Sequence, residues 1–185
     1  NVSKSVKEMS WHFDTLMDMG RFQDGSFEVN LGEFPMDELA RRIDLEVAPL
    51  CNEKNLRWHL DLGDYAVISD PELLLRLLRN LLINAVSYTV QGDVSCIARA
   101  TEKTIEICIY DTGPGLSKEQ QFLIGQTNTA SRQNVIDSSE MQLGFSIVNR
   151  ISRALELTIE VNTSATIGTQ FRFELQRSLT SGDNS

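Results

Sequence analysis

Two asparagines four residues apart are the first side chains in this sequence that could carry chemistry. Asn80 and Asn84 lie in the segment RLLRNLLINAVSYT, and this spacing places both carboxamides on one face of a helix. The residues around them are so apolar that the helix is expected to be buried on most sides. A carboxamide oxygen is a neutral ligand that can bind Mg²⁺ beside phosphates. Alternatively, the pair satisfies buried polar groups and is only structural.

A carboxylate followed by two glycines is the second candidate. Asp111 begins the motif DTGPGL, directly after the alternating apolar segment Ile105–Tyr110. A carboxylate at the end of a buried strand needs hydrogen-bond donors, and the exocyclic amine of adenine is a suitable one. Gly113 and Gly115 allow close backbone approach and a positive φ. Without a ligand, the same residues would form a turn that the Asp side chain caps.

The third candidate is a helix expected to begin at LGFSIV, residues 143–148, after a long polar segment. Free N–H groups at a helix start can bind an anion, although most such sites bind only water or a cap. The two histidines, His12 and His59, stand apart from any metal-like grouping, which argues against a His/Cys metal enzyme. Three widely spaced cysteines, without a CxxC motif, indicate reduced structural thiols.

The elements that must position these residues follow from periodicity and capping signals. Asp70-Pro71 predicts the start of the helix that carries both asparagines, because Asp is a good N-cap and Pro fits the first helical position. Adjacent strands joined by short turns predict an α+β fold, a two-layer α/β sandwich in which helices cover a mixed sheet. The expected helices are 2–23, 37–53, 71–88 and 144–155, with one short helix inside 111–143. The expected strands are 27–31, 57–62, 93–100, 104–110, 157–162 and 169–175.

Composition limits the class of protein. The chain has 185 residues and a net charge of −9, which argues against a nucleic-acid partner because no basic field offsets phosphate repulsion. No segment reaches the roughly 18 apolar residues of a membrane span. The chain does not start with Met and begins inside a helical pattern, so it is expected to be a fragment of a longer protein.

Taken in order, the three motifs resemble the nucleotide-binding boxes of histidine kinases. The segment Asn80–Thr89 resembles the N box, Asp111–Leu116 the G1 box and Leu143–Ile151 the G2 box, while GTQF at 168–171 resembles the strand that closes the nucleotide domain. The segment Arg21–Leu31 is similar to the junction after the second dimerisation helix. The resemblance implies the Bergerat ATP-binding fold. It divides the chain into part of a dimerisation helix (1–25), a catalytic domain (26–177) and a flexible tail (178–185).

The resemblance also implies roles for individual residues. It assigns Asp111 and Thr169 to the adenine amino group, Tyr88 to the adenine ring, and Asn84, with Asn80 beside it, to Mg²⁺ on the phosphates of ATP. The remaining implied ATP-binding residues are Gly113, Gly115 and Leu116 of the G1 box, Leu143, Gly144 and Phe145 at the helix start, and Arg132 and Gln142 as donors from a mobile lid at 117–142.

The implied activity is transfer of the γ-phosphoryl group of Mg-ATP to a histidine outside the sequence, since His12 lacks the surroundings of a phosphoacceptor. The implied partners are a phosphoacceptor helix of the same or a partner subunit, a response regulator or receiver domain, and a second subunit. The implied location is the cytoplasmic side of a sensor, for which an inner-membrane parent is one option.

The sequence departs from the family pattern at three positions. Ser87 stands where the family has Lys, and Glu140 and Gln142 replace glycines of the G2 box; Phe122 is the one candidate for an F box. These departures leave open two alternatives: a degenerate domain that binds nucleotide weakly and acts as an interaction module, and another ATPase or a serine kinase of the same superfamily.

Overall fold

The computed structural model describes residues 28–125 and 140–178, which form seven strands and four helices. The strands are β1 (Gly32–Pro35), β2 (Arg57–Asp61), β3 (Ala66–Ser69), β4 (Asp93–Ala100), β5 (Thr104–Asp111), β6 (Glu160–Ser164) and β7 (Gly168–Arg177). The helices are α2 (Met36–Glu53), α3 (Pro71–Tyr88), α4 (Lys118–Gly125) and α5 (Glu140–Ala154).

The strands form one mixed sheet in the order β1-β3-β7-β5-β4-β2. Every neighbouring pair is antiparallel except β2 and β4, which run parallel. The strand β6 pairs with the first half of β7. The other end of β7 pairs with β3 along the same edge. The pair formed by β5 and β7 is the long central ladder, and it aligns Asp111 with Thr169.

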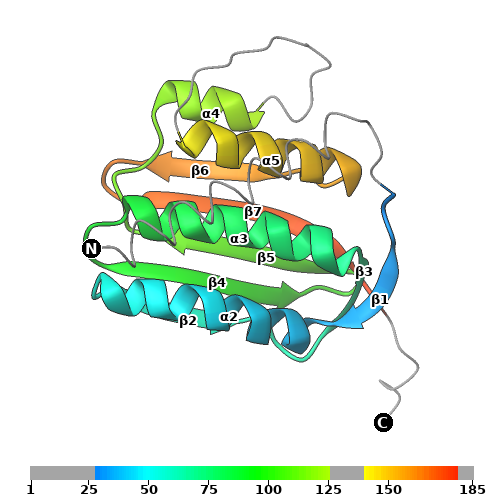
Figure 1. The fold of residues 1–185 in the computed structure, drawn as a ribbon. Coiled ribbons are helices and arrows are strands. Elements are labelled where there is room, and N and C mark those ends of the chain that lie inside the picture. The colour runs from blue at the N-terminus through cyan, green and yellow to red at the C-terminus, as the bar shows by residue number, and fades with distance from the viewer. Residues whose placement is uncertain (1–27, 126–139, 179–185) are drawn as a thin grey trace.

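The helices α2, α3 and α5 lie side by side on one face of the sheet, and no helix of residues 28–125 and 140–178 lies on the other, here called the uncovered face (Figure 1). The helix α3 is central and is buried on nearly all sides by its leucines. Below it, Ile105, Ile107 and Ile109 of β5 point into the core. This is the two-layer α/β sandwich that the sequence predicts.

Both ends of α3 are fixed by side chains. At the start, Asp70 Oδ1 accepts hydrogen bonds from the backbone N–H groups of Glu72 and Leu73, each at 3.0 Å. At the end, the Lys54 ammonium donates to the carbonyls of Val86 and Ser87 at 2.7 and 2.6 Å. A cation at this position satisfies orphan carbonyls and complements the helix dipole. The helix that carries Asn84 is therefore held from both ends.

Two predicted strand boundaries were wrong for physical reasons. Residues 28–31 are not a strand, because the N–H of Asn30 donates to Asp70 Oδ2; the strand begins at Gly32 and pairs with β3, which the sequence did not predict. The strand β6 begins at Glu160 rather than at 157. Beyond α5, Glu156 takes a φ of 55° and the N–H of Leu157 bonds back to the Ser152 carbonyl, a cap that ends the helix and occupies the residues where the strand was expected to begin.

The helix α5 begins at Glu140, four residues before its predicted start at Gly144. The predicted helix at 2–23 and the tail after residue 178 lie outside the described residues. In the parts that are described, no helix combines the length and apolar character needed to cross a bilayer.

Candidate functional site: a nucleotide-sized cavity beside the central ladder

A cavity of about 270 Å³ opens between α3, the ends of β5 and β7, and the segment that leads into α4. Seven of the predicted site residues line it: Asn84, Tyr88, Asp111, Gly115, Leu116, Phe145 and Thr169. Five further lining residues did not appear in the predicted set: Ala85, Pro114, Ser117, Gln120 and Phe171. Residues from three separate sequence motifs therefore meet at one cavity.

Asp111 is the acidic group of this cavity. It ends β5, and its Oδ1 accepts a hydrogen bond from the N–H of Gly113 at 2.9 Å. Burial raises the pKa of this carboxyl, and hydrogen bonds from Gly113 and Thr169 act in the opposite direction. A half-buried carboxylate with remaining acceptor capacity can bind an N–H donor of a ligand.

Close backbone contacts shape the wall next to Asp111. Gly115 has a φ of +77°, and a Cβ there would lie 2.8 Å from the Ser164 carbonyl oxygen. The N–H of Leu116 donates to Thr163 Oγ1 at 2.9 Å, and this hydroxyl is 3.3 Å from that of Thr169. Thr163 thus joins the loop after β5 to the start of β7, a role that nothing in its local sequence indicates.

Asn84 faces the cavity from α3 with its carboxamide buried. Its Nδ2 has no hydrogen-bond partner within residues 28–125 and 140–178. A Cβ on Gly144 of α5 would lie 3.0 Å from that Nδ2 and 3.4 Å from Oδ1. The glycine therefore makes the space that the carboxamide occupies between the two helices.

Asn80, predicted beside Asn84, does not line this cavity. Its Nδ2 donates to the Arg76 carbonyl, one turn back on its own helix, at 2.8 Å. The residue is buried, and the cavity lining contains Asn84 but not Asn80. Asn80 Oδ1 has no hydrogen-bond partner among the described residues. Of the two carboxamides, Asn84 therefore lines the cavity and Asn80 lies one helical turn before it.

Aromatic rings bound two other sides of the cavity. Tyr88, the last residue of α3, remains 40% exposed at its edge. Phe145 and Phe171 are buried, with ring centroids 6.2 Å apart and planes tilted by 46°. Flat apolar surfaces next to a single carboxylate suit a planar heterocycle with an N–H donor.

The start of α4 supplies the outer wall. Ser117 and Gln120 form a reciprocal cap: the N–H of Ser117 donates to Gln120 Oε1 at 2.7 Å, and the N–H of Gln120 donates to Ser117 Oγ at 3.2 Å. The S-x-x-Q spacing is the signal that could have placed this helix start. Phe122, the F-box candidate, is exposed on α4.

The observed start of α5 changes the anion-binding prediction. Since the helix begins at Glu140, the N–H groups of Gly144 and Phe145 lie more than one turn inside it, where intrahelical bonds use them. The free donors belong instead to the first turn, at residues 140–142. Gln142 and Leu143 are the third and fourth residues of α5. The structure does not describe the side chains of residues 140–143. Arg132 lies outside the described residues.

The remaining titratable groups do not form a second reactive centre. Across residues 28–125 and 140–178, no cluster of three His, Cys, Asp or Glu side chains could hold a metal ion. All three cysteines are free and buried. Burial raises the pKa of Cys51 to about 11 and that of Cys96 to about 12, which leaves these thiols unreactive near neutral pH.

Residues 69–179 match the family model described as Histidine kinase-, DNA gyrase B-, and HSP90-like ATPase. The match includes α3, both strands of the central ladder and every residue that lines the cavity. This chain belongs to that family of ATPases. Residues 69–179 therefore form an ATP-binding domain of this family, and ATP is its nucleotide.

Curated relatives are sensor kinases. The chain is 29% identical over 168 residues to the autoinducer 2 sensor kinase/phosphatase LuxQ of Vibrio cholerae, covering 86% of this chain and 20% of LuxQ. It is 25% identical over 177 residues to the adaptive-response sensory kinase SasA of Microcystis aeruginosa, covering 93% and 46%. This ATPase domain is thus of the sensor histidine kinase type, and the chain spans less than half the length of these two relatives.

Solved structures agree on the fold. Histidine kinase AdeS of Acinetobacter baumannii superposes with a TM-score of 0.70 at 19% identity, covering 92% of this chain and 79% of AdeS. The nucleotide-free catalytic domain of histidine kinase ThkA gives 0.64 at 18% identity, covering 80% and 97%. The prediction of a Bergerat-type sandwich is confirmed.

Proposed function

We propose that this chain is the catalytic part of a sensor histidine kinase that transfers the γ-phosphoryl group of Mg-ATP to a histidine outside the sequence. The observation that carries the proposal is the convergence of Asp111 and Asn84 on one cavity, from different elements, in a chain whose curated relatives are sensor kinases. Phosphoryl transfer requires mainly positioning and charge stabilisation. A site that orients ATP without a nucleophile of its own is suited to that task.

In this proposal, Asp111 accepts a hydrogen bond from the exocyclic amine of adenine. Its position at the end of β5 supports the role, because Gly113 and Thr169 hold the carboxyl from behind and leave acceptor capacity toward the cavity. Thr169 reinforces the contact, and Tyr88 and Phe145 bound the ring. Gly113, Gly115 and Leu116 shape the wall around the base, since larger residues at either glycine would meet neighbouring atoms below 3.0 Å.

Mg²⁺ is assigned to Asn84. Its buried carboxamide lines the cavity, and the described residues provide no cluster of acidic or imidazole ligands. This fits a cation held by one or two protein oxygens, nucleotide phosphates and water, as Mg²⁺ commonly is. Mg²⁺ supplies charge neutralisation for the phosphates when it is bound. Free N–H groups of the first turn of α5, with Gln142 and Arg132 as further donors, complete the phosphate end.

The remaining partners follow from the same assignment. Residues 1–25 contribute the end of a dimerisation helix in a homodimer, and residues 26–177 form the catalytic domain, with 178–185 as a tail. The acceptor histidine lies on a helix of the same or the partner subunit, and a response regulator or receiver domain takes the phosphoryl group next. The domain works in the cytoplasm, where ATP is available.

Calorimetry with the 185-residue chain tests the proposal. Mg-ATP should bind with a dissociation constant in the micromolar range, about −8 kcal/mol, and Asn84→Ala should weaken binding more in Mg²⁺ than in EDTA. Asn80→Ala is the matched control, because Asn80 donates to its own helix and does not line the cavity. An absence of heat at millimolar Mg-ATP would favour the degenerate interaction module. An equal loss for Asn84→Ala with and without Mg²⁺ would remove the metal role.

A further inference from the structure

Asp111 and Thr169, two of the residues that border the nucleotide cavity from the central ladder, have direct neighbours on the other face of the sheet. Asp111 pairs with Thr169, and the adjacent rung pairs Tyr110 with Gln170. Because side chains alternate along a strand, Tyr110 and Gln170 project to the uncovered face. They line a separate cavity of about 330 Å³ there, with Arg99, Glu106 and Arg172.

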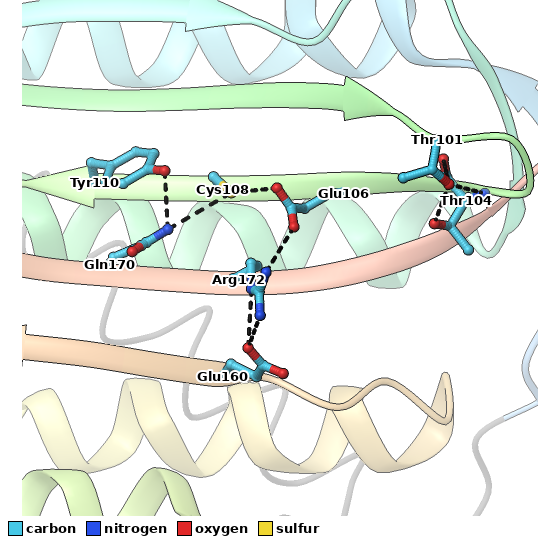
Figure 2. Close-up of polar contacts among 8 residues, drawn as sticks. All are labelled: Thr101, Thr104, Glu106, Cys108, Tyr110, Glu160, Gln170 and Arg172. Atoms are coloured by element: carbon cyan, nitrogen blue, oxygen red, sulfur yellow. Dashed lines mark hydrogen bonds and ion pairs between the residues drawn. The ribbon is translucent and has the colours of Figure 1, made fainter.

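Tyr110 and Gln170 are joined across the two strands. Gln170 Nε2 donates to the Tyr110 hydroxyl oxygen at 3.0 Å, and the same nitrogen is 4.0 Å from Cys108 Sγ (Figure 2). Burial raises the pKa of Tyr110, so its hydroxyl stays neutral and can accept this bond. Cys108 Sγ in turn donates to Glu106 Oε1 at 3.4 Å.

The position of this bond matters because the ladder ends next to it. The strand β5 ends at Asp111, and β7 begins at Gly168, whose φ is +91°. A Cβ on Gly168 would lie 1.9 Å from the Asp111 carbonyl oxygen, so the strands are in close contact at this end. Strand ends open more readily than strand centres. A cross-strand bond between Tyr110 and Gln170, the next pair toward the strand centres, therefore restrains Asp111 and Thr169.

We propose that Tyr110 and Gln170 are positioning residues for adenine recognition: their hydrogen bond on the uncovered face holds Asp111 and Thr169 in register on the nucleotide face. The inference rests on the proposed function. Neither residue touches the nucleotide cavity, and both act through their immediate neighbours in the chain. Loss of the bond leaves the adenine acceptor present but less well placed, which weakens base recognition rather than phosphate binding.

The structure offers a matched control at the other end of β5. Thr104 Oγ1 is 2.8 Å from Thr101 Oγ1, so Thr104→Val and Tyr110→Phe each remove one hydroxyl from the same strand (Figure 2). Of these two residues, only Tyr110 is next to a residue of the nucleotide cavity, Asp111. Gln170→Met removes the amide that Tyr110 binds while keeping a side chain of similar length.

The experiment measures ATP and inosine triphosphate binding by the 185-residue chain and these variants, with thermal unfolding of each. Inosine triphosphate carries an oxo group in place of the exocyclic amine. Tyr110→Phe and Gln170→Met should weaken ATP binding by up to about five-fold, the range of one cross-strand pair. They should lower the preference for ATP over inosine triphosphate, and the double variant should lose no more than either single one. Thr104→Val should leave both quantities unchanged.

Two results would overturn the inference: unchanged ATP affinity in both variants, or an equal loss in Thr104→Val, which would indicate a general effect of stability. Wild-type protein that binds no ATP would instead overturn the proposed function, and this inference with it.

Discussion

Gly144→Ala should separate the stability of the domain from its ability to bind Mg-ATP. Gly144 lies in α5 and is buried against the carboxamide of Asn84. An added Cβ would lie 3.0 Å from Asn84 Nδ2 and 3.4 Å from Oδ1. Since real Cβ contacts are rarely that short, the carboxamide must shift by a few tenths of an ångström.

Two opposing effects set the expected change in the free energy of unfolding of Gly144→Ala. Alanine in a helix interior is more favourable than glycine by about 1 kcal/mol, and the shift of one side chain that borders a cavity costs a similar amount or less. The free energy of unfolding should therefore hold or rise slightly. The displaced carboxamide, in contrast, should bind Mg-ATP about tenfold more weakly, which corresponds to about 1.4 kcal/mol.

The assay combines chemical denaturation with calorimetry in Mg²⁺ and in EDTA. Gly32→Ala is the control, because a Cβ at Gly32 meets no atom within 4 Å; it should leave ATP binding unchanged. The reasoning is refuted if Gly144→Ala binds Mg-ATP as tightly as wild type, since Asn84 would then tolerate displacement or take no part in binding.

Three further predictions use other parts of the structure. Burial holds the pKa of Asp111 above its ordinary value, so its contribution to stability is complete below the unfolded-state pKa and is lost as pH rises through the folded-state pKa; Asp111→Asn should therefore gain stability relative to wild type as pH rises above the ordinary Asp pKa of about 3.9, and denaturation curves showing the opposite trend would contradict this. Lys54→Met should lower the free energy of unfolding by about 1–2 kcal/mol, because it removes the donor to the Val86 and Ser87 carbonyls; the exposed Lys103→Met serves as the control, and equal melting temperatures would refute the capping role. Cys51 and Cys96 should react with a thiol reagent only on unfolding, since burial raises their pKa values to about 11 and 12; rapid labelling of the native protein would contradict that burial.

Local signals in the sequence were sufficient for the central helix and for the strand that ends at the site. Asp70-Pro71 marks the start of α3 because its capping interactions lie within three residues. The alternation of apolar residues before Asp111 likewise indicates that one face of β5 is buried. The order of the three motifs then predicted that Asn84 and Asp111 share a cavity, although neither motif alone was decisive.

Other features depended on contacts between distant residues. The strands β1 and β3 stabilise each other over four residues each, so neither shows a long alternating pattern. Thr163 reaches the site by pairing across the β6–β7 hairpin and bonding to the N–H of Leu116, 47 residues earlier. Asn80 and Asn84 are the same residue type on one helix, and only the tertiary structure shows that Asn84 lines the cavity next to Gly144 of α5 whereas Asn80 does not.

The measurement that tests the central claim most directly is nuclear magnetic resonance of the 185-residue chain during titration with Mg-ATP. Gly115 lines the cavity and Gly113 and Gly168 lie next to Asp111, whereas Gly32 and Gly63 lie elsewhere in the fold. The account predicts saturable shifts of the backbone amide resonances of the first three glycines, and of the Asn84 carboxamide, with little change in the last two. Shifts confined to other regions, or none at millimolar Mg-ATP, would contradict a nucleotide site formed by Asp111 and Asn84.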